Sequence, residues 1–438
     1  MFRFLKHRAI YNRLLGASSR SYGRYVWQQF RRNKRAYLAF YLVCLLALVA
    51  IFADFLANEM PLICSYKGVI HLPILRQYAI DLGLQSRHPD LLLPDWSHLA
   101  YDWVIHAPVP YSVTNQHAAD SALRPFSFSL DGYGWSARHW LGTDDLGRDV
   151  FSAMIHGTRV AFLVGFVSMF IASVLGILLG AMAGFWGDDG FKVARIHLFT
   201  MPFIVFIAYF YGFFNRTYAL SDALSISFTR FLGSFLISLL IFIGILIVGY
   251  RLFRPIARGK GFWAIDVPVA IDLMITRGIE VLVSIPTLII ILAILAITKP
   301  SIYNVMVIIG LMSWPSIARF VRAELLRIRR LEYIEAATAL GYSDFRILFR
   351  HALPNALSPV FIVVAFGIAD AILLESFLSF LGIGSVEMSW GKLLDLARDE
   401  KSNWWLAVFP GFAIFSTITL FNLIGEGLTD ALDPRLKE

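Results

Sequence analysis

The hydrophobic residues of this chain occur in long unbroken runs rather than in alternation with polar residues. Uncharged runs of 18 to 25 residues recur, among them Ala36–Ala53, Val160–Gly184, Phe231–Tyr250 and Trp404–Gly425. A helix needs about 20 apolar residues to cross a bilayer, whereas the strands of a membrane barrel alternate apolar and polar positions. The pattern therefore predicts membrane-spanning helices and argues against strands.

Shorter uncharged runs raise the count to eight predicted spans. Their approximate ranges are 36–56, 159–184, 196–215, 231–250, 278–298, 302–316, 358–382 and 404–425. The composition agrees, because 58% of the residues are hydrophobic and 16% are charged, against about 25% charged residues in soluble domains. We expect an all-α integral membrane protein, a polytopic helical bundle of about eight spans.

The distribution of charge predicts the orientation. Residues 1–36 hold ten Lys/Arg and no acid, whereas Ala57–Val150 hold six Lys/Arg and ten Asp/Glu. Basic loops stay in the cytoplasm, so both termini are expected there and the long loop outside. Residues 251–260 hold no acid, and Ser316–His351 hold seven Lys/Arg against four acids. Both segments fall on the cytoplasmic side. Because the excess charge of +8 follows this pattern, we expect no nucleic-acid partner.

The spans and loops give the following plan. We expect a basic cytoplasmic segment (1–35), a first transmembrane helix (36–56) that is retained rather than cleaved, an extracytoplasmic loop (57–158), a membrane domain (159–430) and a cytoplasmic tail (431–438). The loop lacks helical periodicity, and the spacing of the six histidines from His71 to His139 fits no metal motif, so no metal site is predicted. Cys44 in the first span and Cys64 in the loop cannot easily meet, so no disulfide is expected.

The connection after the sixth span has the pattern of exposed helices. Apolar residues recur at helical spacing and oppose a basic face; they are Ile317, Phe320, Val321, Leu325 and Ile328. Glu332–Leu340 predicts a short second helix that Gly341 ends, with Ser343 capping the next helix and Pro354 limiting it.

This connection has two interpretations. Glu335 offers a charge, and the small Ala336 and Ala337 allow a partner to approach closely. The alternative is an ordinary basic loop at the membrane surface.

The run Leu331–Asn355 resembles the coupling loop of the peptide-type ABC importer permeases. The residues that carry the resemblance are Glu335, Ala336, Ala337, Gly341, Leu353 and Pro354. His351 stands where the wider importer pattern has Ile, as in the peptide branch. The resemblance implies that this loop inserts into a cleft of an ATPase subunit and transmits its closure to the membrane spans.

Other segments are similar to the same family. They are Trp140–Val150, Ser376–Gly382, Ser389–Gly391, Phe409–Gly411, Asp430–Arg435 and the start of the outer loop from Leu56 to Tyr66. The resemblance covers roughly residues 1–186 and 269–438 and is weakest over about 76–135. Taken alone, Thr143–Asp149 predicts an Asx-rich turn in preference to a cation site. The main departure from the family is an inserted two-span hairpin (187–268). It could pack outside the core, bind lipid or contact another subunit.

The resemblance also implies the partners. They are a second permease subunit, two cytoplasmic ATPase domains, an extracytoplasmic solute-binding protein and the lipid bilayer of a bacterial inner membrane. The chain has no Gly-x4-Gly-Lys-Ser/Thr loop, so ATP and Mg would bind the ATPase partners, and this chain would bind no cofactor. We expect no catalytic residues and a peptide cargo. Nickel, glutathione or another small solute are alternatives, as are an ion-coupled carrier and a membrane enzyme.

Two groups of residues within the spans are candidate sites. Gly176, Gly180 and Gly184 are spaced four apart, which allows close helix packing either within this subunit or against a partner permease. Asp370 and Glu375 are charges within the seventh span, and a charge at mid-membrane costs roughly 2.5–3.5 kcal/mol. They are expected to face the bundle interior or a wet cavity on the translocation path, unless they lie near an interface or pair with a basic side chain.

Overall fold

A computed structural model describes residues 22–66, 68–81, 101–129, 138–188, 190, 192–226, 228–259, 261–384, 386–399 and 402–432. The chain divides into two compact units, each of which is described by itself. The first takes the residues up to Leu56, Val113–Gly184 and the residues from Ile279 onward. The second takes Ala57–Ser112 and Phe185–Gly278.

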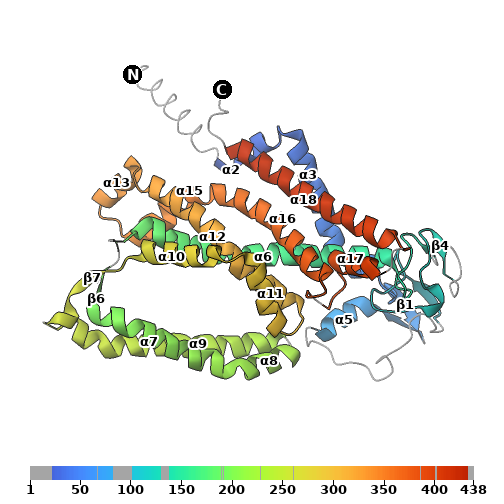
Figure 1. Cartoon of the computed structure of the whole chain (residues 1–438), viewed down its shortest axis with the longest axis horizontal. Coiled ribbons are helices and arrows are strands. Elements are labelled where there is room, and N and C mark those ends of the chain that lie inside the picture. Colours follow the sequence, from blue (N-terminus) through green and yellow to red (C-terminus); the bar gives the residue numbers. More distant parts are fainter. Residues whose placement is uncertain are drawn as a thin grey trace, which may run out of the picture. The chain divides into compact units, whose positions relative to one another are not determined.

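The first unit is built from helices. Its long helices are α3 (Lys34–Ile51), α6 (Val150–Trp186), α12 (Ile302–Ile328), α16 (Ser358–Phe380) and α18 (Trp405–Leu432) (Figure 1). Its shorter helices are α2 (Tyr22–Phe30), α4 (Ala53–Leu56), α11 (Thr287–Ile297), α13 (Glu332–Ala339), α14 (Asp344–Ile347), α15 (Leu353–Ala356) and α17 (Trp390–Asp399). Strands β4 (Ser127–Phe128) and β5 (Arg138–His139) pair antiparallel.

An apolar core joins α6, α11, α12 and α16. Its fully buried side chains include Val164, Ile291, Ile309 and Leu378, one from each of these helices. Side chains of this kind have no polar atom, so they fill the space between helices without leaving a buried hydrogen-bonding group unpaired.

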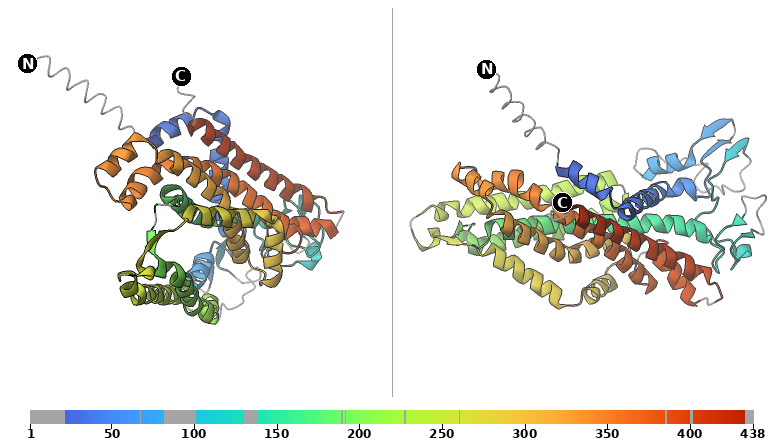
Figure 2. Two further views of the ribbon diagram at one scale, coloured as in Figure 1. Left: turned by 60° about the vertical axis from the view of Figure 1, so that its left-hand side comes forward. Right: turned by 90° about the horizontal axis from the view of Figure 1, so that it is seen from above.

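The second unit contains the inserted hairpin and most of the outer loop. The outer loop forms a sheet of order β2-β1-β3 from Val69–His71, Ile63–Tyr66 and Trp103–Ile105, with α5 at Pro73–Asp81. The hairpin consists of α7 (Arg195–Gly212), a short α8 (Thr217–Ile226) and α9 (Phe228–Ala257). Helices α7 and α9 lie side by side (Figure 2). Strands β6 (Lys192–Ala194) and β7 (Asp266–Pro268) pair antiparallel at the base of the hairpin.

The predicted helical membrane bundle is confirmed. Seven helices of the described residues are long and apolar enough to cross a membrane, and a bent pair of shorter helices gives up to eight. The last part of the predicted outer loop 57–158 is helical, because α6 begins at Val150. Asp54 pairs with side chains of this part of α6, since Arg159 Nη1 lies 2.9 Å from Asp54 Oδ2 and His156 Nδ1 lies 3.9 Å from Asp54 Oδ1.

The fifth predicted span is not straight. Helix α10 (Ile271–Ser284), which joins the two units, meets α11 at an angle of 80°. Pro286 lies in the break and precedes the first residue of α11. Proline has no N–H to donate, and its ring disfavours helical conformation in the preceding residue, Ile285. Because the segment is hydrophobic throughout, its hydrophobic pattern does not predict the bend.

Close packing of α6 against α12 resolves the role of the three glycines. A Cβ on Gly176 would lie 2.6 Å from Ile317 Cβ, and one on Gly180 would lie 2.6 Å from the Ala318 carbonyl oxygen. One on Gly184 would lie 2.7 Å from the Arg322 carbonyl oxygen. The glycines therefore form a seam within this subunit, which was the first of the two predicted alternatives.

The same seam shows that α6 and α12 run in the same direction. Ser168 Oγ donates to the Met306 carbonyl oxygen over 2.9 Å, while Gly184 lies opposite Leu325. Two spans that run the same way are separated by an odd number of crossings. The α7–α9 hairpin supplies an even number, so the bent pair α10–α11 must supply one more, which gives eight spans.

We expect Gly180→Leu to destabilise the protein, because the added side chain must push α6 away from α12. Overpacking of this kind costs about 1–3 kcal/mol or more. The control is Gly411→Leu on α18, where a Cβ meets nothing within 4 Å. Thermal unfolding in detergent should show a lower midpoint for Gly180→Leu alone. Equal midpoints for the two variants would contradict the seam.

Candidate functional site

Helix α12 continues past the membrane span as an amphipathic helix, as predicted. Ile317, Val321, Leu325 and Ile328 are all buried. Phe320 was assigned to the same face, but its side chain is 52% exposed. The buried stripe fixes the direction in which α12 leaves the span, and so fixes where the following helix begins.

The predicted short helix is α13, and it ends where the sequence predicts. Gly341 has a φ of +79°, a conformation that glycine adopts readily. The Tyr342 N–H donates to the Ala337 carbonyl oxygen over 3.2 Å, and the Gly341 N–H donates to that of Thr338 over 2.9 Å. These two bonds form a Schellman motif, which satisfies the carbonyls at the helix end.

The candidate docking residues of α13 do not all face outward. Glu335 and Ala336 are exposed, whereas Ala337 is buried together with Ile334. The small side chain of Ala337 therefore serves packing inside this chain, and only Ala336 leaves room for close approach from outside. Glu332 and Glu335 lie in the first turn of α13, where negative charge is favourable.

After α13 the chain is helical almost without interruption into the seventh span. Helix α14 passes through a π-helical turn, Leu348–Ala352, into α15 and then α16. The Leu353 N–H donates to the Leu348 carbonyl oxygen, so the turn accommodates Pro354, which has no N–H. Leu353 is partly buried and Pro354 is exposed. Ser343 is the residue before α14, but its side chain makes no capping bond, contrary to the prediction.

A side-chain bond that the sequence analysis missed ties α13 to α15. The Asn355 amide donates to the Tyr333 hydroxyl over 3.3 Å and to the His351 carbonyl oxygen over 2.8 Å. The two residues are 22 positions apart, so no local pattern pairs them. The only indication of this bond in the sequence is that both residues carry a polar group within a largely apolar loop.

The loop presents large apolar side chains to its surroundings. Leu340, Tyr342, Phe345 and Phe349 are each between 40% and 74% exposed. The Phe345 and Phe349 rings are stacked at 6.4 Å, and the guanidinium of Arg346 lies over the Tyr342 ring at 5.3 Å. Together with Glu335 and Ala336 they form a surface that we call the docking face. Several large exposed apolar side chains within one short helical loop are typical of a protein interface.

The segment Thr143–Asp149 is an Asx-rich turn, as predicted. Asp144 Oδ1 accepts hydrogen bonds from the N–H groups of Leu146 and Arg148, and its Oδ2 accepts from Arg148 Nε over 2.7 Å. Asp149 Oδ1 accepts from the Ser152 N–H over 2.7 Å and so caps the start of α6. The turn is a structural element that begins the second span.

A buried histidine holds this turn to the preceding loop. His139 Nδ1 lies 2.7 Å from Asp149 Oδ2, and its Nε2 lies 3.3 Å from Asp120 Oδ2. The histidine and both aspartates are almost fully buried. Ionised carboxylates only accept hydrogen bonds, so both contacts are satisfied when His139 carries a proton on each nitrogen.

The same turn is bonded to the start of α18. Trp405 Nε1 donates to the Thr143 carbonyl oxygen over 2.9 Å, and Asn403 Nδ2 donates to Asp145 Oδ1 over 2.9 Å. Trp390 of α17 donates to the Met154 carbonyl oxygen of α6 over 3.0 Å. These bonds join α6, α17 and α18 at one end of the first unit.

The two charges of the seventh span are in different environments. Glu375 is buried, and its carboxylate accepts hydrogen bonds from the hydroxyls of Ser379 (2.7 Å), Ser376 (3.4 Å) and Ser389. Asp370 is exposed on this chain. The expectation of a position in the bundle interior therefore fits Glu375, whereas Asp370 does not face the interior of this subunit.

Comparison with known proteins identifies the family. The family described as "Binding-protein-dependent transport system inner membrane component" matches residues 261–438, and the "N-terminal TM domain of oligopeptide transport permease C" matches residues 21–66. The dipeptide transport system permease protein DppC of Alkalihalophilus pseudofirmus is 30% identical over 69% of this chain and 74% of its own length. The chain belongs to this family of permeases.

Two other relatives show the breadth of this permease family. The glutathione transport system permease protein GsiD of Pectobacterium atrosepticum is 30% identical over 71% of this chain and 78% of its own length. The peptidoglycan transport system permease protein YejE of Agrobacterium fabrum is 27% identical over 93% of this chain and 92% of its own length. The docking face of the permease lies within residues 261–438, whereas the α7–α9 hairpin lies outside both matched regions.

We expect the stability of this permease to fall as the pH rises through the pKa of His139. Burial alone would lower that pKa, but the hydrogen bonds and charges of Asp149, and then those of Asp120, outweigh burial and raise it. A raised pKa means that the folded state binds the proton more tightly. The stabilisation of the folded state by protonated His139 is therefore complete below the ordinary histidine pKa of about 6.5, and it is lost as the pH rises above the raised pKa.

The measurement is the thermal unfolding midpoint as a function of pH. His139→Gln removes one buried contact, so it should cost about 1–3 kcal/mol at low pH and flatten the decline. His71→Gln, on β2 in the outer loop, is the control and should keep the wild-type profile. If the unfolding midpoint of His139→Gln falls with rising pH as steeply as that of the wild type, a group other than His139 causes the pH dependence.

Proposed function

We propose that this permease forms half of a translocation pathway for peptides and receives force from an ATPase at the docking face. The observation that carries the proposal is the exposed apolar surface of Leu340, Tyr342, Phe345 and Phe349 on a loop that joins α12 to α16 through short helices. The carbonyl groups at the end of α13 are satisfied by the Schellman motif, so this end of the docking face is preformed, which lowers the entropy cost of docking.

The contacts support a route for the force. Movement of α13 reaches α12 through the tight turn Arg329–Leu331, where the Leu331 N–H donates to the Ile328 carbonyl oxygen. It reaches α16 through Asn355 and the π-helical turn. The docked loop can bias the spans only if it binds the ATPase better in one state than in the other. Ala336 allows a close approach, and Glu335 can pair with a basic partner residue.

Peptides are the proposed cargo because the relatives include a dipeptide permease. Glutathione, which the name of another relative contains, nickel and other small solutes are the alternatives within the same family. Uptake assays with labelled candidates separate them. An ion-coupled carrier would need no ATPase, so copurification with an ATPase distinguishes the two classes.

The proposed assembly contains a second permease subunit, two cytoplasmic ATPase domains and an extracytoplasmic solute-binding protein in a bacterial inner membrane. ATP and Mg would bind the ATPase subunits, and the present chain would perform no covalent chemistry. Both termini and the docking face are placed in the cytoplasm on the basis of the positive-inside pattern. Asp145 and its neighbours then lie on the outer side.

The test of the docking face is the double variant Glu335→Lys with Gly341→Val. The first change reverses the charge, and the second forces a β-branched residue into a positive φ, so the docking face is lost while the spans are untouched. We expect peptide uptake to fall at least tenfold, a change of about 1.4 kcal/mol or more, with normal amounts of this subunit in the membrane. Glu324→Lys, on α12 before the loop, is the control. Normal uptake by the double variant would refute the proposal.

We also propose that Asp370 lines the translocation path or faces the second permease. Asp370, Leu373 and Phe377 share one exposed face of α16, and an exposed charge within a span must meet water or a polar partner rather than lipid. Asp370→Asn should reduce uptake severalfold more than it reduces assembled complex. Uptake per assembled complex is the measurement, with Ser358→Asn at the start of α16 as control. Equal losses of uptake and of assembled complex would contradict this assignment.

A further inference from the structure

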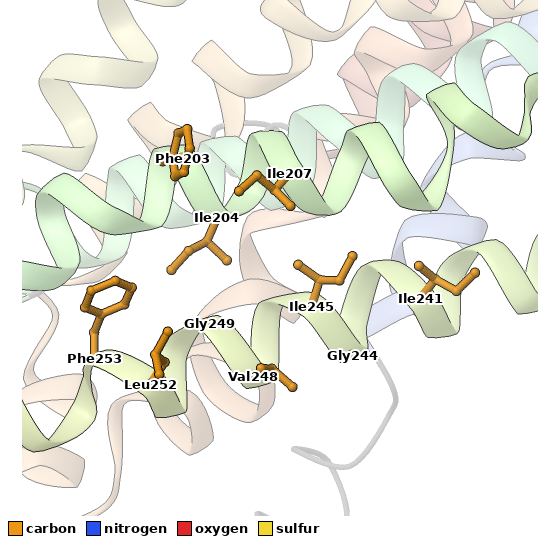
Figure 3. A pocket seen from close by; sticks show the side chains of 10 residues that line it. All are labelled: Phe203, Ile204, Ile207, Ile241, Gly244, Ile245, Val248, Gly249, Leu252 and Phe253. Atoms are coloured by element: carbon orange, nitrogen blue, oxygen red, sulfur yellow. The ribbon is translucent and has the colours of Figure 1, made fainter.

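The inserted hairpin contains an apolar groove between α7 and α9 (Figure 3). Its volume is about 570 Å³. The residues that line it are all apolar or glycine: Phe203, Ile204, Ile207, Ile241, Gly244, Ile245, Val248, Gly249, Leu252 and Phe253. The groove therefore offers no hydrogen bond and suits a hydrocarbon ligand.

Two glycines of α9 shape this groove in opposite ways. A Cβ on Gly249 would lie 2.5 Å from Ile204 Cγ2, so Gly249 lets α7 and α9 approach closely and forms the floor. A Cβ on Gly244 would meet nothing within 4 Å. Space therefore remains above Gly244 that no described side chain of this protein fills.

The length of the groove matches one leaflet of a bilayer. Its lining on α9 extends from Ile241 to Phe253, which at 1.5 Å per residue is about 18 Å. Half of a hydrocarbon core of about 30 Å is about 15 Å. A single acyl chain can therefore lie along the groove from the membrane surface toward the mid-plane.

A basic cluster lies at the surface end of the groove. Arg251, Arg254 and Arg258 are all exposed, and residues 251–259 contain no acid. Among the described residues, the side chains of these arginines have no hydrogen-bond, ion-pair or ring partner. Arg251 follows Gly244 and Val248 at steps of seven and three, which places it on the same side of α9 as that edge of the groove.

We propose that the hairpin binds an anionic phospholipid, with one acyl chain in the groove and the phosphate at Arg251, Arg254 and Arg258. Basic pockets between transmembrane helices at the cytoplasmic surface suit acidic headgroups, and arginine binds phosphate through paired donors. The charge distinguishes this ligand from a zwitterionic lipid, and the groove distinguishes it from a free phosphate. Only the assignment to the cytoplasmic leaflet depends on the orientation proposed above.

The experiment is native mass spectrometry of the assembled complex in detergent, with added phosphatidylglycerol or phosphatidylcholine. The wild type should retain phosphatidylglycerol at least tenfold more strongly. The triple variant Arg251→Gln, Arg254→Gln and Arg258→Gln should lose this preference. Gly244→Leu should lose the bound lipid because its side chain fills the groove. Gly233→Leu is the matched control, since Gly233 is on the same helix, is open and lies outside the groove.

Each contrary result overturns a definite part of the proposal. Retention of phosphatidylglycerol by the triple arginine variant would exclude the phosphate site. Loss in that variant but full retention in Gly244→Leu would mean attraction to the headgroup alone, without a chain in the groove. Equal retention of phosphatidylcholine by the wild type would exclude selectivity for charge. If no lipid is retained and a copurifying subunit crosslinks to Val248, the groove is a protein interface instead of a lipid site. None of these readouts uses uptake, so they stand apart from the test of the docking face.

Discussion

Close contact between α6 and α12 is the constraint on which the rest of the first unit depends. Gly176, Gly180 and Gly184 bring two backbones together at a distance that no larger residue permits. In a membrane, where burial of apolar surface drives little association, such contact is a main source of helix packing. Because it also makes the two spans parallel, it determines that the bent α10–α11 segment crosses the bilayer and on which side α12 emerges.

The two ends of this packed unit differ in their bonding. At one end, buried polar bonds tie the Thr143–Asp149 turn to α18 and to the preceding loop, through Trp405, Asn403 and His139. At the other end, α13 is joined by a tight turn and one amide–hydroxyl bond, and the large apolar side chains that follow α13 in the docking face are exposed. A unit that is fixed at one end and exposed at the other can respond to a partner without losing its packing.

The sequence was sufficient for features that depend on local periodicity and was insufficient for those that depend on tertiary contact. The spans, α13 and its end at Gly341 follow from hydrophobic runs and from the conformational freedom of glycine. The inward position of Ala337 does not, because it depends on what α13 packs against. Pro286 was visible, but hydrophobicity gave no sign of an 80° bend. Tyr333 and Asn355 pair only once the chain has folded, and the early start of α6 relies on Asp54.

Helix α6 has one further consequence. Its last charged residue before the uncharged run is Arg159, and nine residues of helix precede it, which amounts to about 14 Å of stalk beyond the hydrocarbon. A headgroup layer adds only about 5–8 Å on each side of the hydrocarbon core. The Asx-rich turn thus stands clear of the lipid, at a height where a water-soluble protein can touch it without displacing a single phospholipid.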